Sequence, residues 1–145
     1  MNKIFNKKYS MKKFILSMLA MVTLCAAEAK PVVKSISSPN GKIKVTVTIE
    51  NDIRWSVTSG EDVILAPSQI AMQINDSEVW GAAPRLRKSV VGTIDERIPS
   101  PLYKKSEVEN ECTTLTLSFK GDYAIELRAY DNAAAYRFIS TRKDD

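Results

Sequence analysis

The sequence predicts an incomplete all-β antiparallel sandwich behind an N-terminal leader. From Lys42 to Glu50, apolar and polar residues alternate strictly, which is the pattern of a half-buried strand. Turn-forming residues recur at intervals of roughly 8 to 12 positions, a spacing typical of antiparallel sandwiches and barrels. Beyond the leader, no window has helical periodicity. The chain has 145 residues, and the part after the leader is long enough for one domain with a modest core.

Residues 1–29 have the three parts of a secretory signal peptide. Lysines crowd the start, an apolar run covers 14–27, and Ala27-Glu28-Ala29 gives a small-residue exit. The apolar run is shorter than the roughly 20 residues that span a bilayer. We expect cleavage after Ala29, export to the periplasm or outside the cell, and a mature domain of residues 30–145 with no stable membrane insertion. An uncleaved anchor is the alternative interpretation.

Removal of this leader changes the charge balance. The whole chain has 21 basic and 17 acidic residues, of which residues 1–29 hold five and one, leaving 16 of each. The mature chain is therefore neutral. No basic patch remains to predict a nucleic acid or an anionic membrane as a partner.

The mature chain divides into strands and turns. We expect strands at 42–50, 53–58, 63–65, 68–74, 86–91 and on to 98, 115–119, 123–129 and 134–138, with a loop at 75–81. Pro99-Ser100-Pro101 predicts extended or turn geometry and excludes a central strand there. The alternation predicts that Lys44, Thr46 and Arg54 are exposed. It predicts a core of Val45, Val47, Trp55, Leu117, Ile125, Leu127, Tyr136 and Phe138.

Few residues of the chain are candidates for catalysis or metal binding. The chain contains no histidine, which excludes serine–histidine and cysteine–histidine nucleophiles and imidazole metal sites. Cys112 alternates out of phase with Leu115 and is interpreted as an unreactive thiol. Three carboxylates project from one strand face, at Glu107, Glu109 and Glu111. They could bind calcium, but a solvated face or a protected edge is the favoured interpretation.

Three further candidates are weaker. Asp95 and Glu96 are adjacent on a strand and point to opposite faces, so they cannot flank a glycosidic bond as an acid and base. Trp55 is in phase with Ile53 and Val57 and is assigned to the core. Trp80 lies in a polar segment, where packing at an interface and packing within the loop remain equally open, and sugar contact is a lesser alternative.

Two segments carry a resemblance to a known family. Ser38-Pro39-Asn40-Gly41-Lys42 precedes an alternating strand, and the chain later runs from Leu127 to Phe138 as LRAYDNAAAYRF, with IPSPLYKKS at 98–106 between them. This resembles the N-terminal domain of glycoside hydrolase family 97, which opens with S-P-D/N-G-K and contains R-A-Y-D-D-G-x-A-Y-R-F. Asn132-Ala133 replaces the usual Asp-Gly, so we expect either a shifted turn or a left-handed Asn132.

The resemblance implies a sandwich of the super-sandwich type, which is the front domain of an exported α-glucosidase or α-galactosidase that acts on α-linked oligosaccharides. It also implies calcium dependence, and a (β/α)₈ barrel after residue 145 that holds the catalytic carboxylates and packs on this domain. No catalytic, cofactor-binding or metal-ligating residue is assigned in this chain, which we expect to be inactive alone. The rival interpretation is a stand-alone exported carbohydrate-binding or interaction domain, and the gene sequence downstream of Asp145 distinguishes the two.

Overall fold

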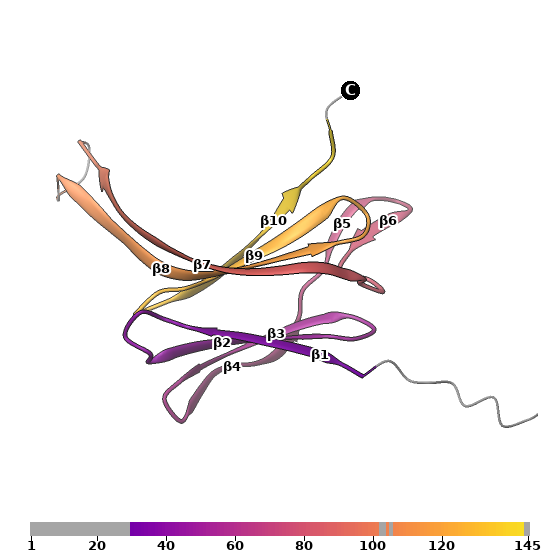
Figure 1. The fold of residues 1–145 in the computed structure, drawn as a ribbon, viewed down its shortest axis with the longest axis horizontal. Coiled ribbons are helices and arrows are strands. Elements are labelled where there is room, and N and C mark those ends of the chain that lie inside the picture. Colours follow the sequence, from indigo (N-terminus) through magenta and orange to yellow (C-terminus); the bar gives the residue numbers. More distant parts are fainter. Residues whose placement is uncertain (1–29, 102–103, 105, 144–145) are drawn as a thin grey trace, which may run out of the picture.

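A computed structural model describes residues 30–101, 104 and 106–143, and the predicted leader lies outside these residues. The described part consists of two four-stranded antiparallel sheets and one two-stranded hairpin, with no helix. The sheets stack as a sandwich (Figure 1), in which β1 lies across from β8 and β2 across from β9. The predicted fold class is confirmed. Among the described residues, no helix could cross a membrane.

The first sheet follows chain order. It contains β1 (Val32–Ser37), β2 (Ile43–Ile49), β3 (Ile53–Ser59) and β4 (Asp62–Gln69). The strict alternation of β2 produces alternating burial, and Val45 and Val47 are fully buried. Val47 stands opposite Trp55 and Val45 opposite Val57, because the three-residue turn at 50–52 keeps both apolar sets on one face.

The second sheet has the order β10-β9-β8-β7. Its strands are β7 (Leu86–Pro99), β8 (Glu107–Phe119), β9 (Tyr123–Ala129) and β10 (Ala134–Ser140). β7 and β8 are paired along their whole lengths, from Leu86 opposite Phe119 to Pro99 opposite Glu107. β9 pairs with β8 only as far as Thr113. The remainder of β7 and β8 therefore forms a two-stranded arm, defined here as residues 94–99 and 107–112.

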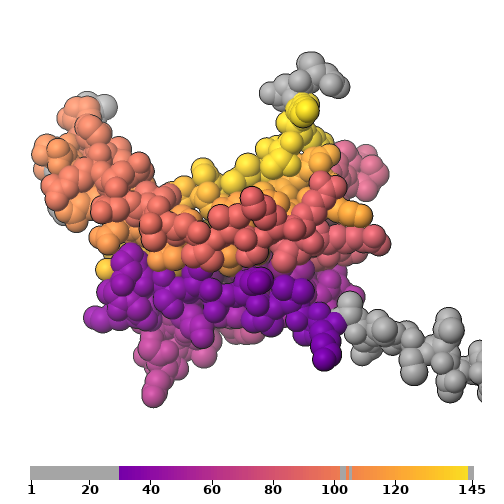
Figure 2. Space-filling model, viewed as in Figure 1, coloured from indigo at the N-terminus to yellow at the C-terminus, as the bar shows by residue number. Residues whose placement is uncertain are grey.

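The arm extends past the first sheet and curves away from it (Figure 1). The space-filling view shows it as a projection at one end of the molecule (Figure 2). From Asp95 to Pro99 and from Glu107 to Glu109, every residue is exposed. Nothing in the described chain covers this end of the second sheet.

The third element is a hairpin of β5 (Met72–Asn75) and β6 (Glu78–Trp80) beside β9 and β10 (Figure 1). Gly81 follows it with a φ of +94°, and a Cβ there would overlap the carbonyl oxygen of Ile70. Only glycine suits both the left-handed backbone and this close approach. The prediction of a loop at 75–81 is wrong, because β6 lies within this range and only a tight turn separates it from β5. In that turn, the Asn75 side chain accepts hydrogen bonds from Ser77.

The core lies between the two sheets. Val45, Val47, Leu117, Ile125 and Leu127 are fully buried as predicted, and each contributes roughly 1.5–3 kcal/mol to the free energy of unfolding. Lys44 and Arg54 are exposed as predicted, whereas Thr46 is half-buried. Three of the residues predicted to lie in the core are less buried than expected. Trp55 and Phe138 are half-buried, and Tyr136 is 41% exposed because β10 is an edge strand.

Other differences concern strand limits. β1 was not predicted, because it is mostly exposed and lacks alternation. The strand predicted at 68–74 is divided, since β4 ends at Gln69 and β5 begins at Met72. The short strands predicted from 86 to 98 form the single strand β7, and β8 starts well before Leu115. Pro67 lies within β4, which is allowed because β4 is an edge strand.

Candidate functional site

The predicted carboxylate candidates all lie on the arm. Asp95 stands opposite Glu111, and Glu96 stands opposite Asn110 and accepts a hydrogen bond from its side-chain amide. Glu107 and Glu109 are exposed and lie 3.7 and 3.9 Å from the guanidinium of Arg97. Such exposed pairs stabilise a protein little. The three glutamates form a solvated face, and the described residues contain no acidic or cysteine cluster that could hold a metal ion.

Cys112 is placed as expected but is more buried than its phase suggested. The register puts it opposite Ile94, out of phase with Leu115. Its side chain is nevertheless completely buried. A thiolate acts as a nucleophile only where substrate can reach it, so the position of Cys112 favours the interpretation as an unreactive thiol.

Trp80 is buried against residues of another strand, and is therefore neither an exposed platform nor packed only within its loop. Its indole stacks on Tyr123 with ring centroids 5.2 Å apart, and Tyr123 stacks on Phe119 at 5.0 Å. The Tyr123 hydroxyl accepts a hydrogen bond of 3.2 Å from the backbone N–H of Gly81. Burial raises the pKa of Tyr123 above its ordinary value, and the bond from Gly81 opposes that shift. This aromatic column fixes the β5–β6 hairpin to the second sheet.

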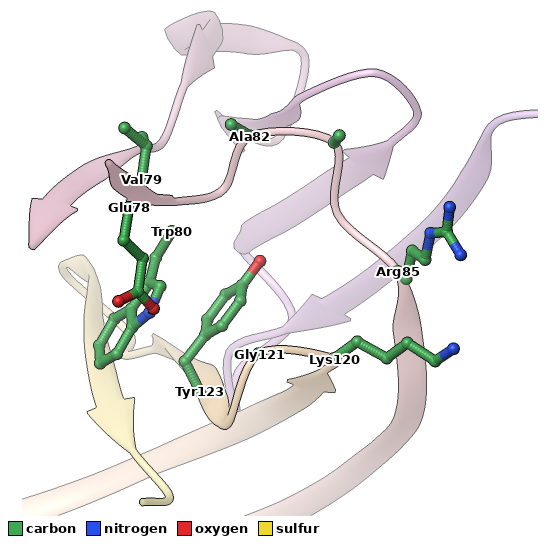
Figure 3. Close-up of a pocket in the computed structure, with 9 residues that line it drawn as sticks. Glu78, Val79, Trp80, Ala82, Arg85, Lys120, Gly121 and Tyr123 are labelled. Atoms are coloured by element: carbon green, nitrogen blue, oxygen red, sulfur yellow. The ribbon is translucent and has the colours of Figure 1, made fainter. Parts of the chain in front are cut away.

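A small cavity of about 230 Å³ lies beside this column (Figure 3). Glu78 lies on one side and Arg85 and Lys120 on the other. Glu78 is already occupied, because its carboxylate accepts hydrogen bonds from the Trp80 indole and from Arg142. The bond from Arg142, then that from Trp80, lowers the pKa of Glu78. The Arg142 guanidinium also lies 5.6 Å from the centre of the Trp80 ring. Arg142 therefore attaches the segment after β10 to the β5–β6 hairpin.

The largest polar network covers the outer face of the second sheet, which we call the open face. It consists of the alternate residues of β7–β10 that point away from the first sheet. One cross-strand row of this face runs Val90, Thr116, Glu126, Arg137, and a second row runs Gly92, Thr114, Arg128, Ala135. On the arm, the same face carries three cross-strand pairs, Ile94 with Cys112, Glu96 with Asn110 and Ile98 with Val108.

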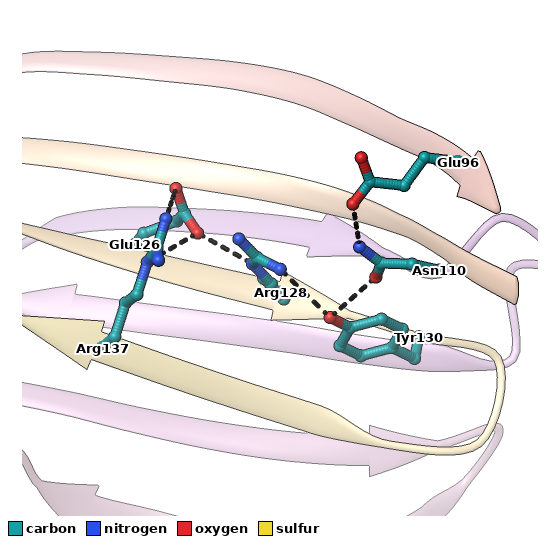
Figure 4. A network of polar contacts seen from close by, with 6 residues as sticks. All are labelled: Glu96, Asn110, Glu126, Arg128, Tyr130 and Arg137. Carbon is teal, nitrogen blue, oxygen red and sulfur yellow. Dashed lines mark hydrogen bonds and ion pairs between the residues drawn. The ribbon is translucent and has the colours of Figure 1, made fainter. Parts of the chain in front are cut away.

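Glu126 is the centre of this network (Figure 4). Its carboxylate accepts hydrogen bonds from Arg128 at 2.8 Å and from Arg137 at 3.2 Å. Arg128 also donates to the Tyr130 hydroxyl, which donates in turn to Asn110. The side chains of Glu126 and Arg128 are only 14% and 23% exposed. The charges of Glu126, Arg128 and Arg137 are therefore paired with one another.

The pKa values of the pair reflect this pairing. Burial raises the pKa of Glu126, but the hydrogen bonds from Arg128 and Arg137 outweigh it and leave the pKa below its ordinary value. Hydrogen bonds to Tyr130 and Glu126 raise the pKa of Arg128. Both groups are charged at neutral pH. The face offers hydrogen bonds and paired charges, but it has no second carboxylate placed across a cavity from Glu126.

The two segments that carry the resemblance meet at one end of the sandwich. The carboxylate of Asp131, in the β9–β10 turn, accepts a hydrogen bond from the backbone of Asn40, in the β1–β2 turn. Across the β9–β10 turn, the Tyr130 N–H donates to the carbonyl oxygen of Ala133. Neither Asn132 nor Ala133 has a positive φ, so Asn132 is not left-handed.

Comparison with known proteins agrees with this arrangement. The family model described as "Glycosyl-hydrolase 97 N-terminal" matches residues 36–144, the range that holds both resembling segments. The chain belongs to this family.

Relatives of the chain are much longer proteins. A retaining alpha-galactosidase of Bacteroides thetaiotaomicron is 36% identical over 133 residues, which are 92% of this chain but only 20% of that protein. Two solved structures of a glycoside hydrolase family 97 enzyme from Pseudoalteromonas sp. strain K8, one with acarbose and one with panose, match with a TM-score of 0.64. They are 16% and 15% identical and share the fold over 72% of this chain and 17% of theirs.

The network around Glu126 was not predicted from sequence. Glu126, Arg128 and Tyr130 do alternate with the buried Ile125, Leu127 and Ala129, so the outward direction of their side chains was readable. Their mutual hydrogen bonds depend on the pairing of β9 with β8 and β10, which one-dimensional periodicity does not specify.

Proposed function

We propose that this chain is the N-terminal β-sandwich domain of an exported α-glycosidase that acts on α-galactosides or α-glucosides. In this proposal the domain packs on a catalytic barrel of the same polypeptide, completes its rim and hydrolyses nothing alone. The observation that carries the proposal is the family match over residues 36–144, combined with the 20% share of the galactosidase that the chain spans.

The chemistry of the described residues supports a scaffold role. Glycosidic cleavage generally requires two carboxyl groups on either side of the bond, held roughly 5–9.5 Å apart. Glu126 and Glu78 are each paired with arginine, and the carboxylates of the arm are exposed on a projecting hairpin. Calcium is implied by the resemblance for the whole enzyme, and the described residues contain no group of three or more acidic or cysteine side chains that could hold the ion by themselves.

The test compares residues 30–145 with the full-length protein. Both are assayed on nitrophenyl α-galactoside and α-glucoside with calcium, with the corresponding β-linked compounds as controls. We expect turnover of an α-linked substrate by the full-length protein alone. Turnover by the short chain that disappears when one of its own carboxylates is replaced would overturn the scaffold role.

Export is tested separately. The exported product should begin near Lys30 on N-terminal sequencing, because the small-residue exit directly follows the apolar run. A mature protein that retained Lys12 and Lys13 would contradict cleavage and support the membrane anchor instead.

A further inference from the structure

We infer that the Asn40–Gly41 peptide is a site of spontaneous deamidation, which the folded β1–β2 turn keeps unreactive and which unfolding exposes. The sequence contains Asn-Gly at this one position. Glycine has no Cβ beside its amide nitrogen, so this nitrogen is unusually free to attack the side chain of the preceding asparagine. Asn40 and Gly41 are both exposed. Water therefore reaches the peptide, and only the geometry of the turn can protect it.

The reaction has two steps and needs only water and hydroxide. The amide nitrogen of Gly41 loses its proton to hydroxide and attacks Cγ of Asn40. A bond from this nitrogen to Cγ forms, and the side-chain nitrogen takes a proton from water and leaves as ammonia, which closes a succinimide ring. Water then opens the ring at one of its two carbonyl carbons. Opening at Cγ gives an aspartate side chain, whereas opening at the main-chain carbonyl gives an isoaspartyl link that runs through Cβ and Cγ.

The folded turn withholds the attacking nitrogen. The Gly41 N–H donates a hydrogen bond of 2.8 Å to the carbonyl oxygen of Ser38. This bond closes a β-turn whose second residue is Pro39, where the ring already fixes φ. An amide in such a bond gives up its proton only when the structure around it opens, as in hydrogen exchange. The first step of deamidation requires the same opening.

Asn40 is itself held by three further hydrogen bonds. Its Oδ1 accepts from the Ser38 hydroxyl and from the Lys42 N–H, both at 2.9 Å. Its own N–H donates to the carboxylate of Asp131, also at 2.9 Å. The two donors to Oδ1 would polarise Cγ, as donors do in an oxyanion hole. This polarisation favours the reaction only after the Gly41 N–H has been released, so the opening of the turn limits the rate.

The two products differ in their effect on the turn. In both hydrogen bonds of the Asn40 side chain the oxygen is the acceptor, and an aspartate at this position can accept them as well. An isoaspartyl link instead adds one main-chain atom between the Asn40 N–H and the Gly41 N–H. These donors bond Asp131 and Ser38, so the turn cannot re-form unchanged. A chain that deamidates while unfolded should therefore refold into a less stable domain.

The test incubates the full-length protein at mildly alkaline pH, folded or in urea, and follows Asn40 by peptide mass spectrometry. Deamidation replaces NH₂ by OH, and the mass change is assigned to the peptide that contains Asn40. We expect the folded protein to react at least about 10-fold more slowly than the unfolded protein, because only the open fraction of the turn reacts. Gly41→Ala is the chemical control in urea, where its methyl group should slow the reaction independently of the fold.

Asp131→Ala and Glu61→Ala form the matched pair in the folded protein. Asp131→Ala removes the acceptor of the Asn40 N–H and should raise the folded-state rate roughly 5-fold through the loss of one hydrogen bond. Its rate in urea should stay unchanged. Glu61→Ala removes a carboxylate from the β3–β4 turn and should change neither rate. Refolded protein enriched in isoaspartate should have a lower midpoint of thermal unfolding, whereas Asn40→Asp should keep the natural midpoint.

Four results would overturn the inference. Equal rates in the folded and the unfolded protein would show that the turn gives no protection. A reaction in urea that spares Asn40 would remove the site itself. An unchanged folded-state rate in Asp131→Ala would separate the reaction from the junction between the two turns. Equal midpoints for Asn40→Asp and for the isoaspartyl protein would contradict the effect of the added main-chain atom.

Discussion

The carboxylate of Asp131 accepts a hydrogen bond of 2.9 Å from the backbone N–H of Asn40, 91 positions earlier in the sequence. The Asn40 side chain in turn accepts from the Ser38 hydroxyl and from the Lys42 N–H. A turn of the first sheet and a turn of the second are thus joined at one end of the sandwich. The S-P-N-G segment and the segment around Asp131 are therefore one structural feature.

Replacing Asp131 tests this junction. Asp131→Ala should lower the free energy of unfolding by about 1 kcal/mol, because it leaves the Asn40 N–H without its acceptor. Asp131→Asn should cost less, since the amide oxygen can still accept. Urea unfolding measures both, with Glu61→Ala in the exposed β3–β4 turn as the control. A cost of Asp131→Ala equal to that of Glu61→Ala would show that the bond contributes nothing.

Gly81 should tolerate no side chain. Gly81→Ala combines a left-handed backbone with an overlap on the Ile70 carbonyl oxygen, so we expect a loss of roughly 3 kcal/mol or more. Gly60 has a φ of +58° and open space around it, and Gly60→Ala should cost only about 1 kcal/mol. Thermal unfolding of the two variants separates the overlap from the backbone strain. Equal midpoints would mean that the Ile70–Gly81 approach relaxes freely.

The Tyr123 hydroxyl should matter more than that of Tyr136. Tyr123→Phe leaves the buried N–H of Gly81 unpaired, at a cost of about 1–2 kcal/mol. Tyr136 is 41% exposed, so Tyr136→Phe should change stability very little. Chemical denaturation followed by circular dichroism measures the difference. Equal losses would indicate that ring packing, which both variants keep, governs this region.

Glu126 should make the free energy of unfolding depend on pH in the acidic range. Its pKa is lowered in the folded state, so its stabilising contribution is present above the unfolded pKa of about 4.3 and is lost as pH falls through the folded value. Glu126→Gln should therefore be less stable than the natural protein at pH 7, and the gap should close in acid. Glu61→Gln should show no such convergence. A gap that stayed constant between pH 7 and pH 3 would contradict the role of Arg128 and Arg137.

The alternation of apolar and polar residues along the sequence predicted the central strands of the fold. β2 and β9 alternate cleanly because each has one face in the core and one in solvent, so their buried residues were predictable. β1 was missed and Tyr136 was misplaced for one reason. Both belong to edge strands, where the opposite sheet does not fully cover the inward side chains.

The candidate surfaces were harder to predict from the sequence than the core. Trp80 was expected in a polar loop, but its burial depends on Tyr123, which is 43 positions away and reaches it through the pairing of distant strands. The Glu126 network depends likewise on which strands lie side by side. Periodicity predicts the face on which a residue lies but not its neighbours across that face.

The complete burial of Cys112 has a practical consequence. It is the sole cysteine among the described residues and lies in β8, close to where β8 leaves β9 to form the arm. An alkylating reagent can reach its sulfur only after the structure around it opens. The modification rate under native conditions therefore measures local opening at this position, which gives the domain a natural kinetic reporter at the base of its arm.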